Sequence, residues 1–222
     1  MAVQQNDPKL QAAREQAQAA VRSLRERCPK LGDDAIDVIL RDSRSHYAWS
    51  DRPVDEALLR EIYDITAQGP TSMNSCPARF VFVRSDEAKA KLEPALKPPN
   101  VPKMRGAPVT VIIAHDVDFW QQLPKLFPHE DRRHLFEGKP EHCEKTAFRN
   151  GTLQGAYFMI AARALGLDVG AMSGFSNEAV DEAFFGGTNW RSNFLCNLGY
   201  ADESALFHKL PRFEFDEACQ FI

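Results

Sequence analysis

The sequence predicts a mixed α/β layer fold, and three observations support this class. Helical and strand-like segments alternate only partly, the inferred strands are few, and the helical content exceeds the strand content. A chain of 222 residues with 44% hydrophobic side chains can fill the core of one compact domain, or of one domain plus an arm. We therefore expect a helical arm over residues 1–32 and one folded domain over residues 33–222.

The N-terminal part of the chain predicts two helices. From Pro8 to Cys28 the strong helix formers predominate, but the apolar stripe is thin, so this helix is expected to lie on a partner or to extend from the domain. A second helix is expected to begin at Asp33 or Asp34, because either carboxylate can cap free backbone amides, and to run toward Arg41.

The remaining elements follow from two patterns. Apolar residues that recur every three or four positions predict helices, and short β-branched or aromatic runs predict strands. In the first half of the domain we expect a helix carrying Leu58–Ile65 that ends at Gly69, a strand over 79–84, a helix around 86–96, a loop over 97–103 and a strand over 108–114. In the second half we expect a loop or lid with a short helix over 123–140, a long helix over 141–165, a strand over 167–171, a helix over 177–185 and a strand over 193–200.

Charge and cysteine usage exclude several classes of protein. Lys and Arg number 27 against 31 Asp and Glu, so no uniform positive field exists to attract nucleic acid. The sequence shows neither a secretory signal nor a membrane span, which predicts a soluble cytoplasmic protein without a membrane partner. Five cysteines, an odd number without C-x-x-C spacing, fit neither a disulfide scaffold nor a zinc ribbon, and we expect reduced thiols.

Common catalytic and binding motifs are also missing. No G-x-G-x-x-G phrase and no Walker loop occurs, so neither a dinucleotide fold nor a nucleotide-phosphate loop is predicted. Gly170 stands one residue too far from Ser173 for a nucleophile elbow. His129 and His134 are spaced so that they occupy different helical faces, and solvated loop histidines explain them better than a metal site. We expect no metal.

Three polar phrases, far apart in the sequence, are the most informative. They are Arg44-Ser45-His46, the proline-bracketed run from Pro70 to Pro77, and Ala171-Met172-Ser173-Gly174-Phe175 at a strand end. A guanidinium with a hydroxyl can receive a phosphate, prolines make a loop rigid, and a glycine lets a flat ligand approach exposed backbone amides. Each phrase alone is equally consistent with an ordinary solvated turn or a capped connection.

The order of these phrases, followed by Lys209-Leu210-Pro211, resembles the nitroreductase family of FMN enzymes along residues 44–211. The resemblance implies an α+β fold in which helices flank a central, mostly antiparallel sheet. It also implies an intertwined homodimer with flavin sites at the interface, and NADPH or NADH as the electron donor.

The resemblance implies a role for each phrase. Arg44 and Ser45 would hold the phosphate or the pyrimidine side of FMN, Asn74 would bind the isoalloxazine edge, and a backbone amide near Ser173 would face flavin N5. Lys209 would contact the phosphate. The full set implied to bind the cofactor is Arg44, Ser45, His46, Pro70, Thr71, Ser72, Asn74, Met172, Ser173, Gly174 and Lys209.

The sequence departs from the family pattern at two positions. Tyr47 stands where many members carry a basic residue, so that His46, Lys209 or Arg212 must supply the charge. Ser173 stands where an acidic residue is often found near N5. These departures weaken a direct transfer of substrate range from the general nitroreductases.

Further phrases, among them Thr146–Asn150 and Asn197–Tyr200, resemble a subgroup that reduces malonic semialdehyde (3-oxopropanoate) to 3-hydroxypropanoate in pyrimidine degradation. A reduced flavin already carries the hydride, so no catalytic side chain is singled out. An acid aldehyde needs a fixed cation, for which Arg149 is the candidate, with Arg79 and Arg191 behind it. Arg149 can equally pair with a neighbouring acid. A broad nitro- or quinone reductase, and an FMN-storing or FMN-sensing protein without useful turnover, remain the alternatives.

Overall fold

The structure is a computed structural model that describes residues 8–222. Its contacts divide the chain into two units, with the boundary between Asp42 and Ser43. The division expected from the sequence, after residue 32, falls inside the first unit. The described part of the chain contains no helix long and apolar enough to cross a membrane.

The first unit is helical. Helix α1 spans Pro8–Arg27 with all its side chains largely outside any core, which agrees with its thin apolar stripe. Helix α2 (Asp33–Ile36) continues into the π-helical turn η1 (Asp37–Arg41), and Arg41 bonds back to the carboxylates of both Asp33 and Asp37. The expected capping by Asp33 or Asp34 is wrong, because Gly32 occupies the capping position and no side chain caps the helix.

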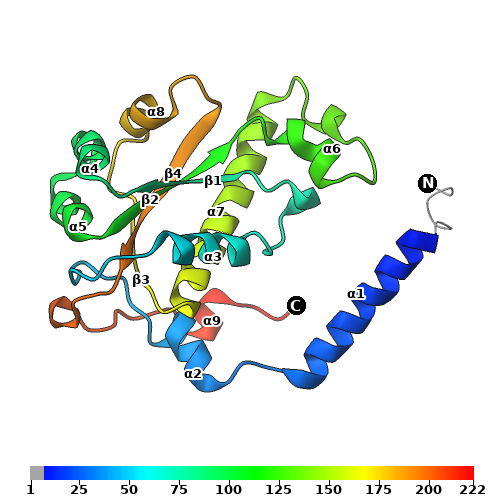
Figure 1. The fold of residues 1–222 in the computed structure, drawn as a ribbon, viewed down its shortest axis with the longest axis horizontal. Helices are drawn as coiled ribbons and strands as arrows, with labels where there is room; N and C mark the ends of the chain where they lie inside the picture. Colours follow the sequence, from blue (N-terminus) through cyan, green and yellow to red (C-terminus); the bar gives the residue numbers. More distant parts are fainter. Residues whose placement is uncertain (1–7) are drawn as a thin grey trace. The chain divides into compact units, whose positions relative to one another are not determined.

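The second unit is built on a four-stranded antiparallel sheet in the order β1-β2-β4-β3 (Figure 1). The strands are β1 (Ala78–Val83), β2 (Val109–Asp116), β3 (Asp168–Met172) and β4 (Trp190–Gly199). Strand β2 lies in the middle and is buried along nearly its whole length, as its continuous β-branched run predicts. Strand β3 forms one edge of the sheet, so its outer side is not paired with another named strand.

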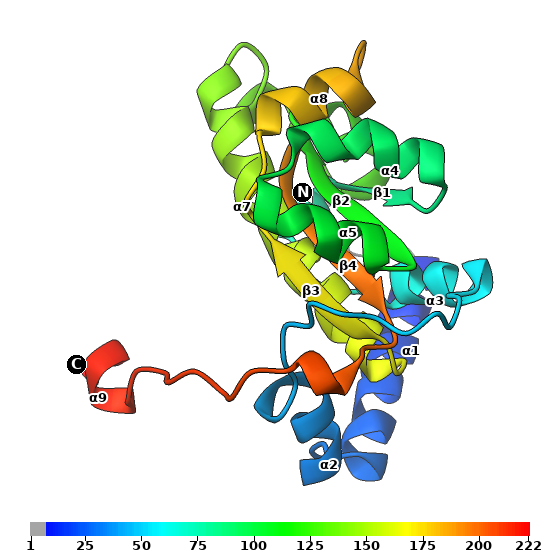
Figure 2. The same cartoon turned by 90° about the vertical axis from the view of Figure 1, so that its left-hand side faces the viewer.

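Helices cover both faces of the sheet (Figures 1 and 2). One face carries α3 (Glu56–Thr66) and the long α7 (Pro140–Ala164), and the other carries α4 (Asp86–Leu92), α5 (Val101–Gly106) and α8 (Asn177–Phe185). The loop expected over 97–103 is wrong in part, because a 3-10 turn at Pro98–Asn100 leads into α5. Its prolines stand in first turns, where the missing N–H costs no helical hydrogen bond.

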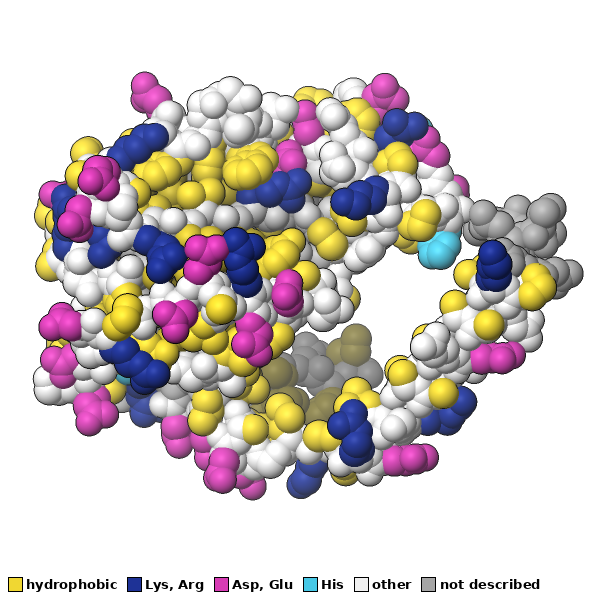
Figure 3. Space-filling model, viewed as in Figure 1, with side chains coloured by type: hydrophobic (Ala, Val, Ile, Leu, Met, Phe, Trp, Pro, Cys, Tyr) yellow, Lys and Arg dark blue, Asp and Glu magenta, His cyan; other side chains and the backbone are white. Residues whose placement is uncertain are grey.

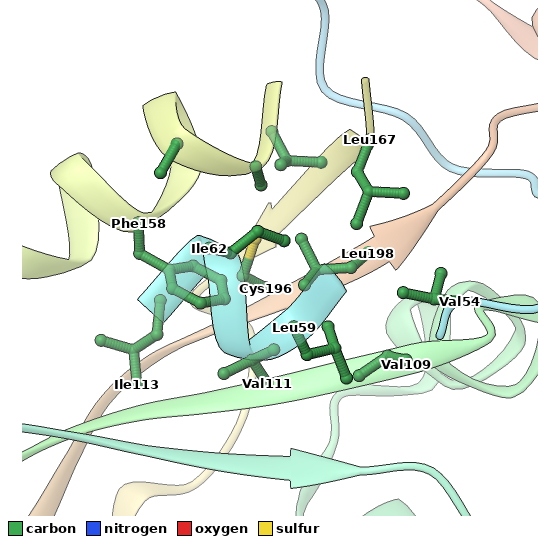
Figure 4. Packing of buried hydrophobic residues seen from close by; sticks show 13 residues of the cluster. Val54, Leu59, Ile62, Val109, Val111, Ile113, Phe158, Leu167, Cys196 and Leu198 are labelled. Atoms are coloured by element: carbon green, nitrogen blue, oxygen red, sulfur yellow. The ribbon is translucent and has the colours of Figure 1, made fainter. Parts of the chain in front are cut away.

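The side chains on the two faces of β2 pack into two separate hydrophobic cores. Val111 and Ile113 pack toward α3 and α7, where Figure 4 shows them around Phe158 and Ile62. The alternate residue Ile112 joins the core beneath α4, α5 and α8. This two-residue alternation is what a strand buried on both faces requires. Burying a side chain such as Phe158 contributes about 1.5–3 kcal/mol.

The segment expected as a loop or lid holds short helical turns. Helix α6 spans Leu123–Leu126 between the 3-10 turns η5 (Phe119–Gln122) and η6 (Arg133–Leu135). Phe119, Leu123 and Phe136 form a small core of their own against the start of α7. The segment is therefore packed onto the domain by three buried anchors.

Two surface features complete the second unit. Basic and acidic side chains are interspersed over the face shown in Figure 3, so neither sign forms a continuous field there. After the 3-10 turn η7 (Glu203–Ala205), the chain runs away from the sheet and ends with the short helix α9 (Phe215–Ala218), as Figure 2 shows. Phe207, Phe213 and Phe221 are strongly exposed in this tail.

Candidate functional site

The Arg44–His46 segment lies along the outer edge of β3. Ser45 forms a parallel bridge with Val169, and the amide of His46 donates a 3.0 Å hydrogen bond to the Val169 carbonyl. Further along, Trp49 bridges to Ala201, and the amide of Ser50 bonds to the carbonyl of Tyr200 at 2.8 Å. A polar phrase that the sequence placed in an exposed stretch is thus paired with the sheet edge.

The three side chains of this segment differ in accessibility. Ser45 is exposed and Arg44 is half-buried, with its guanidinium donating to the Ser43 carbonyl at 3.1 Å. His46 is buried, and its Nε2 lies 3.2 Å from Oδ1 of Asp168. The Nε2 of His46 is therefore engaged by a carboxylate of the same chain, whereas the Ser45 side chain faces solvent.

The strand end beyond β3 offers unused backbone donors. The N–H groups of Ser173 and Gly174 donate no hydrogen bond within residues 8–222, whereas the Gly174 carbonyl accepts from the Lys97 amide and from Asn100 Nδ2 at 2.9 and 3.0 Å. Those two contacts fix the orientation of the peptide, and a Cβ at position 174 would collide with Asn100. Two fixed, free amides next to each other can bind a carbonyl or ring nitrogen of a ligand.

A cavity of about 330 Å³ adjoins these amides. It is lined by Thr152, Ala156, Met159, Ala171, Met172, Ser173 and Phe194, which come from α7, β3 and β4. Apolar walls beside a few fixed donors suit a flat, largely apolar ring. Strands rise about 3.3 Å per residue, so Val169 beside Ser45 and Ser173 at the cavity lie roughly 13 Å apart along β3.

The donor set along this edge fits an FMN-like molecule. A guanidinium and a hydroxyl at one end suit a phosphate, and free amides above an apolar floor suit a heteroaromatic ring at the other end. The described residues contain no group of three or more side chains that could hold a metal ion.

The Pro70–Asn74 loop is tightly organised. The Ser72 amide donates to Asn150 Oδ1 at 2.8 Å, and the Tyr157 hydroxyl donates to the Pro70 carbonyl at 3.1 Å. Met73 and Asn74 both adopt positive φ angles, 53° and 51°, which only a well-supported backbone sustains in residues other than glycine. Asn74, expected to bind the flavin edge, donates through Nδ2 to the Leu126 carbonyl at 2.8 Å.

The structure does not bring this loop together with the cavity in one chain. The loop contacts α7 at Asn150 and Tyr157, whereas the cavity is lined by Thr152, Ala156 and Met159 of the same helix. With about 3.6 residues per turn, these two sets of residues point roughly 140° apart around the helix axis. The predicted pocket is therefore split between two flanks of α7.

The other predicted residues lie elsewhere. Lys209 is exposed in the tail beyond η7. Arg149 is exposed on α7 and makes neither a hydrogen bond nor an ion pair within the described residues, so the alternative in which it pairs with a neighbouring acid is not what the structure shows. Arg79 binds Asp116 at 2.7 Å, and Arg191 lines a larger cavity of about 830 Å³ at the start of α7.

Sequence reasoning missed three residues beneath the Arg44–His46 segment, namely Asp168, Arg163 and Gly170. The Asp168 carboxylate accepts from His46 and from the Ala201 amide, and chiefly the His46 hydrogen bond lowers its pKa. Arg163 donates to the Arg44 carbonyl at 3.3 Å, and burial lowers the pKa of its guanidinium. The signal available in the sequence was Gly170, since a glycine inside a strand marks a close backbone approach.

The fold and site thus define an α+β protein whose edge strand carries a segment with guanidinium and hydroxyl donors and, at its end, a cavity the size of a ring. The model of the nitroreductase family matches residues 40–200, which is most of the chain. This chain belongs to the nitroreductase family.

Named relatives agree with this assignment. A Burkholderia lata protein provisionally named NADH dehydrogenase/NAD(P)H nitroreductase is 57% identical over 187 residues, covering 84% of this chain and 96% of the relative. A Stutzerimonas stutzeri protein with the same provisional name is 51% identical, covering 85% of this chain and 96% of the relative.

A solved structure from Exiguobacterium sibiricum, described as a nitroreductase in complex with FMN, superposes with a TM-score of 0.76 at 20% identity. It covers 87% of this chain and 99% of that one. At this level of identity the similarity establishes the nitroreductase-like fold.

Proposed function

We propose that this chain is an FMN-dependent NAD(P)H oxidoreductase, with its cofactor along the outer edge of β3. The observation that carries the proposal is the pair of free amides at Ser173 and Gly174 beside the apolar cavity. The guanidinium of Arg44 and the hydroxyl of Ser45, at the other end of the same edge, suit the phosphate. The names of the relatives support NAD(P)H as donor, and the FMN complex of the same fold supports the cofactor.

The protein's own contribution is to bind, orient and exclude water. When bound, FMN supplies the hydride chemistry, accepting from NAD(P)H and delivering to an acceptor. The amides of Ser173 and Gly174 would hold the ring edge, and Met159 and Phe194 would provide a dry wall beneath it. No side chain of this chain is needed as a nucleophile.

A second copy of the chain would complete the site. Because the Pro70–Asn74 loop and the cavity lie on different flanks of α7, only a partner can bring the loop to the cavity. Between those flanks α7 exposes an apolar strip, in which Leu153 is 39% exposed and Ile160 is half-buried. An apolar strip on the longest helix suits a two-fold interface, in which each copy covers the other.

For the acceptor we propose 3-oxopropanoate, reduced to 3-hydroxypropanoate. Arg149 supports this choice, because it is a cation without a carboxylate partner in the described chain and lies one turn from Leu153 on the proposed interface. A broad nitro- or quinone reductase is the second candidate, favoured by the largely apolar lining of the cavity and by the names of the relatives.

The first test is the colour of the purified protein. We expect a yellow protein whose flavin absorbance falls in Arg44→Ala, while Arg60→Ala, a distant exposed arginine paired with Glu56, leaves it unchanged. Colourless protein that does not take up added FMN would overturn the proposal.

The second test is steady-state oxidation of NADPH and of NADH with different acceptors. Rapid turnover with 3-oxopropanoate that is lost in Arg149→Ala supports the acid aldehyde. Turnover with nitroaromatics or quinones alone supports the broad reductase. Slow flavin reduction by both nicotinamides indicates a protein that stores or senses FMN.

A further inference from the structure

We infer that Asp168, Arg163 and Gly170 are positioning residues that hold the Arg44–His46 segment against β3 and thereby set the preference of the site for phosphorylated over unphosphorylated flavin. The inference rests on the proposed function, since it concerns the segment assigned to the phosphate. None of the three residues needs to touch the ligand. Each acts through the backbone or the ring of the segment.

Asp168 holds the segment against β3 through two hydrogen bonds. One carboxylate oxygen lies 3.2 Å from His46 Nε2, and the other accepts the Ala201 amide at 2.9 Å. Ala201 in turn bridges to Trp49, so a single carboxylate joins both ends of the strip from His46 to Trp49. The His46 side chain is 10% exposed, and its other ring nitrogen has no partner, so Asp168 is the only side chain within residues 8–222 that hydrogen-bonds the ring.

Arg163 fastens the segment at its other end. The residue projects from the last turn of α7, and its Nη2 donates to the Arg44 carbonyl at 3.3 Å. A guanidinium keeps its charge even where burial lowers its pKa, and the nearby Asp168 carboxylate opposes that lowering. The hydrogen bond holds the peptide that follows Arg44, which fixes where the Arg44 side chain begins.

Gly170 permits the close contact. A Cβ at this position would overlap the His46 carbonyl oxygen and press against the Trp49 ring. Because the nearest atom belongs to the His46 backbone, it cannot move aside as the end of a flexible side chain could. Any larger residue at position 170 must therefore displace the segment from the strand. The absence of a side chain at 170 therefore sets the distance between the Arg44–His46 segment and the sheet.

These three contacts place the segment before any ligand arrives. Holding Arg44 and Ser45 in one geometry lowers the ordering cost of binding the phosphate, and only a ligand that carries the phosphate gains from this. Riboflavin has the same ring without the phosphate. The ratio of riboflavin to FMN dissociation constants therefore reports on the segment and not on the ring cavity.

The experiment measures both dissociation constants by flavin fluorescence titration of the full chain. We expect Asp168→Ala to weaken FMN about tenfold while riboflavin changes less than about twofold. Asp168→Asn, which keeps one acceptor oxygen, is expected to restore part of the FMN affinity. Asp116→Ala is the matched control, because it breaks the half-buried pair with Arg79 between β1 and β2.

The outcomes separate the two proposals. If wild type binds neither flavin, the proposed function fails. If wild type prefers FMN but Asp168→Ala weakens both flavins equally, or weakens neither, the positioning role is wrong. Circular dichroism of each variant shows whether the fold is kept. If Asp168→Ala fails to fold, Arg163→Met removes the hydrogen bond to the Arg44 carbonyl instead and tests the same positioning role.

Discussion

The backbone amide of Ser72 donates a 2.8 Å hydrogen bond to Oδ1 of Asn150, and this bond ties the Pro70–Asn74 loop to α7. Asn150 is 3% exposed and uses its Nδ2 to bond the Thr146 carbonyl of its own helix, so its amide is fixed at both ends. The position of the loop therefore depends on α7, which packs against the sheet. Its strained backbone can persist because of that support.

Asn150→Ala is expected to release this loop. The change removes two hydrogen bonds of a buried side chain, to the Ser72 amide and to the Thr146 carbonyl, and this should cost about 1–3 kcal/mol of unfolding free energy in urea titrations. FMN retention on gel filtration should fall as well. Gln68→Ala, which removes an exposed side chain bonded to the Asp64 carbonyl, serves as control, and equal stability of the two variants would contradict the expectation.

Gly69→Ala is expected to destabilise the protein because its Cβ would overlap the ring of Tyr157. The same change in a Tyr157→Ala background should cost much less, since the obstructing ring is gone. Thermal unfolding of the two single variants and the double variant measures this coupling. Additive effects would show that the ring is not the obstacle.

Thiol labelling should distinguish the five cysteines. Cys28 and Cys219 are exposed, and we expect iodoacetamide to label them first at mildly alkaline pH. Cys196 is buried, and burial raises its pKa to about 12, so it stays a protonated and unreactive thiol. Peptide mass spectrometry should detect Cys196 labelling only after denaturation. Early labelling of Cys196 in native protein would contradict its burial in the core between the sheet and helices α3 and α7.

Asp168 should contribute to stability in a pH-dependent way. The hydrogen bond from His46 lowers the pKa of its carboxyl in the folded state, so the unfolded chain takes up the proton first as the pH falls. The stabilisation is present above the unfolded pKa and is lost as the pH falls through the folded pKa. Wild type should therefore lose more stability than Asp168→Asn between about pH 6 and about pH 3. Urea unfolding at several pH values measures this difference. An equal loss of unfolding free energy in wild type and in Asp168→Asn over that range would contradict the prediction.

Leu153→Glu should weaken the proposed dimer, because it places a charge on the exposed strip of α7. Light scattering after gel filtration should then show a larger monomer fraction, together with loss of FMN. Leu153→Ala keeps the strip apolar and is the control. A stable dimer with Leu153→Glu would place the interface on another surface.

The sequence predicted most of the fold because local signals agreed with the tertiary structure. The helix over 177–185 begins where Ser176 caps the Ala179 amide, and α7 ends where Gly166 takes a φ of 81°. Helix α5 was missed because prolines in its first turn resemble those of a loop. Propensity alone does not separate the two cases.

The site was predictable only in part. Arg44, Ser173 and the Pro70–Asn74 loop carry recognisable phrases, and the structure gives two of these regions a shared strand edge. The partners of His46 and Arg44 could not be inferred, because Asp168 and Arg163 reach them from distant parts of the chain without any local pattern. The split of the site across α7 was equally invisible, since it depends on helix orientation over the sheet.

Residues 45–50 pair with β3 and with the chain just after β4. This pairing also reduces the tendency of the protein to aggregate through the edge of its sheet. An edge strand left bare presents unpaired N–H and C=O groups on which another sheet can grow. The Ser45–Val169 and Trp49–Ala201 bridges cap those groups. Variants that loosen the segment, such as Gly170→Ala, would therefore lower the solubility of the protein as well as its affinity for the ligand. Selection for solubility and selection for ligand affinity would both preserve the pairing of this segment with the sheet.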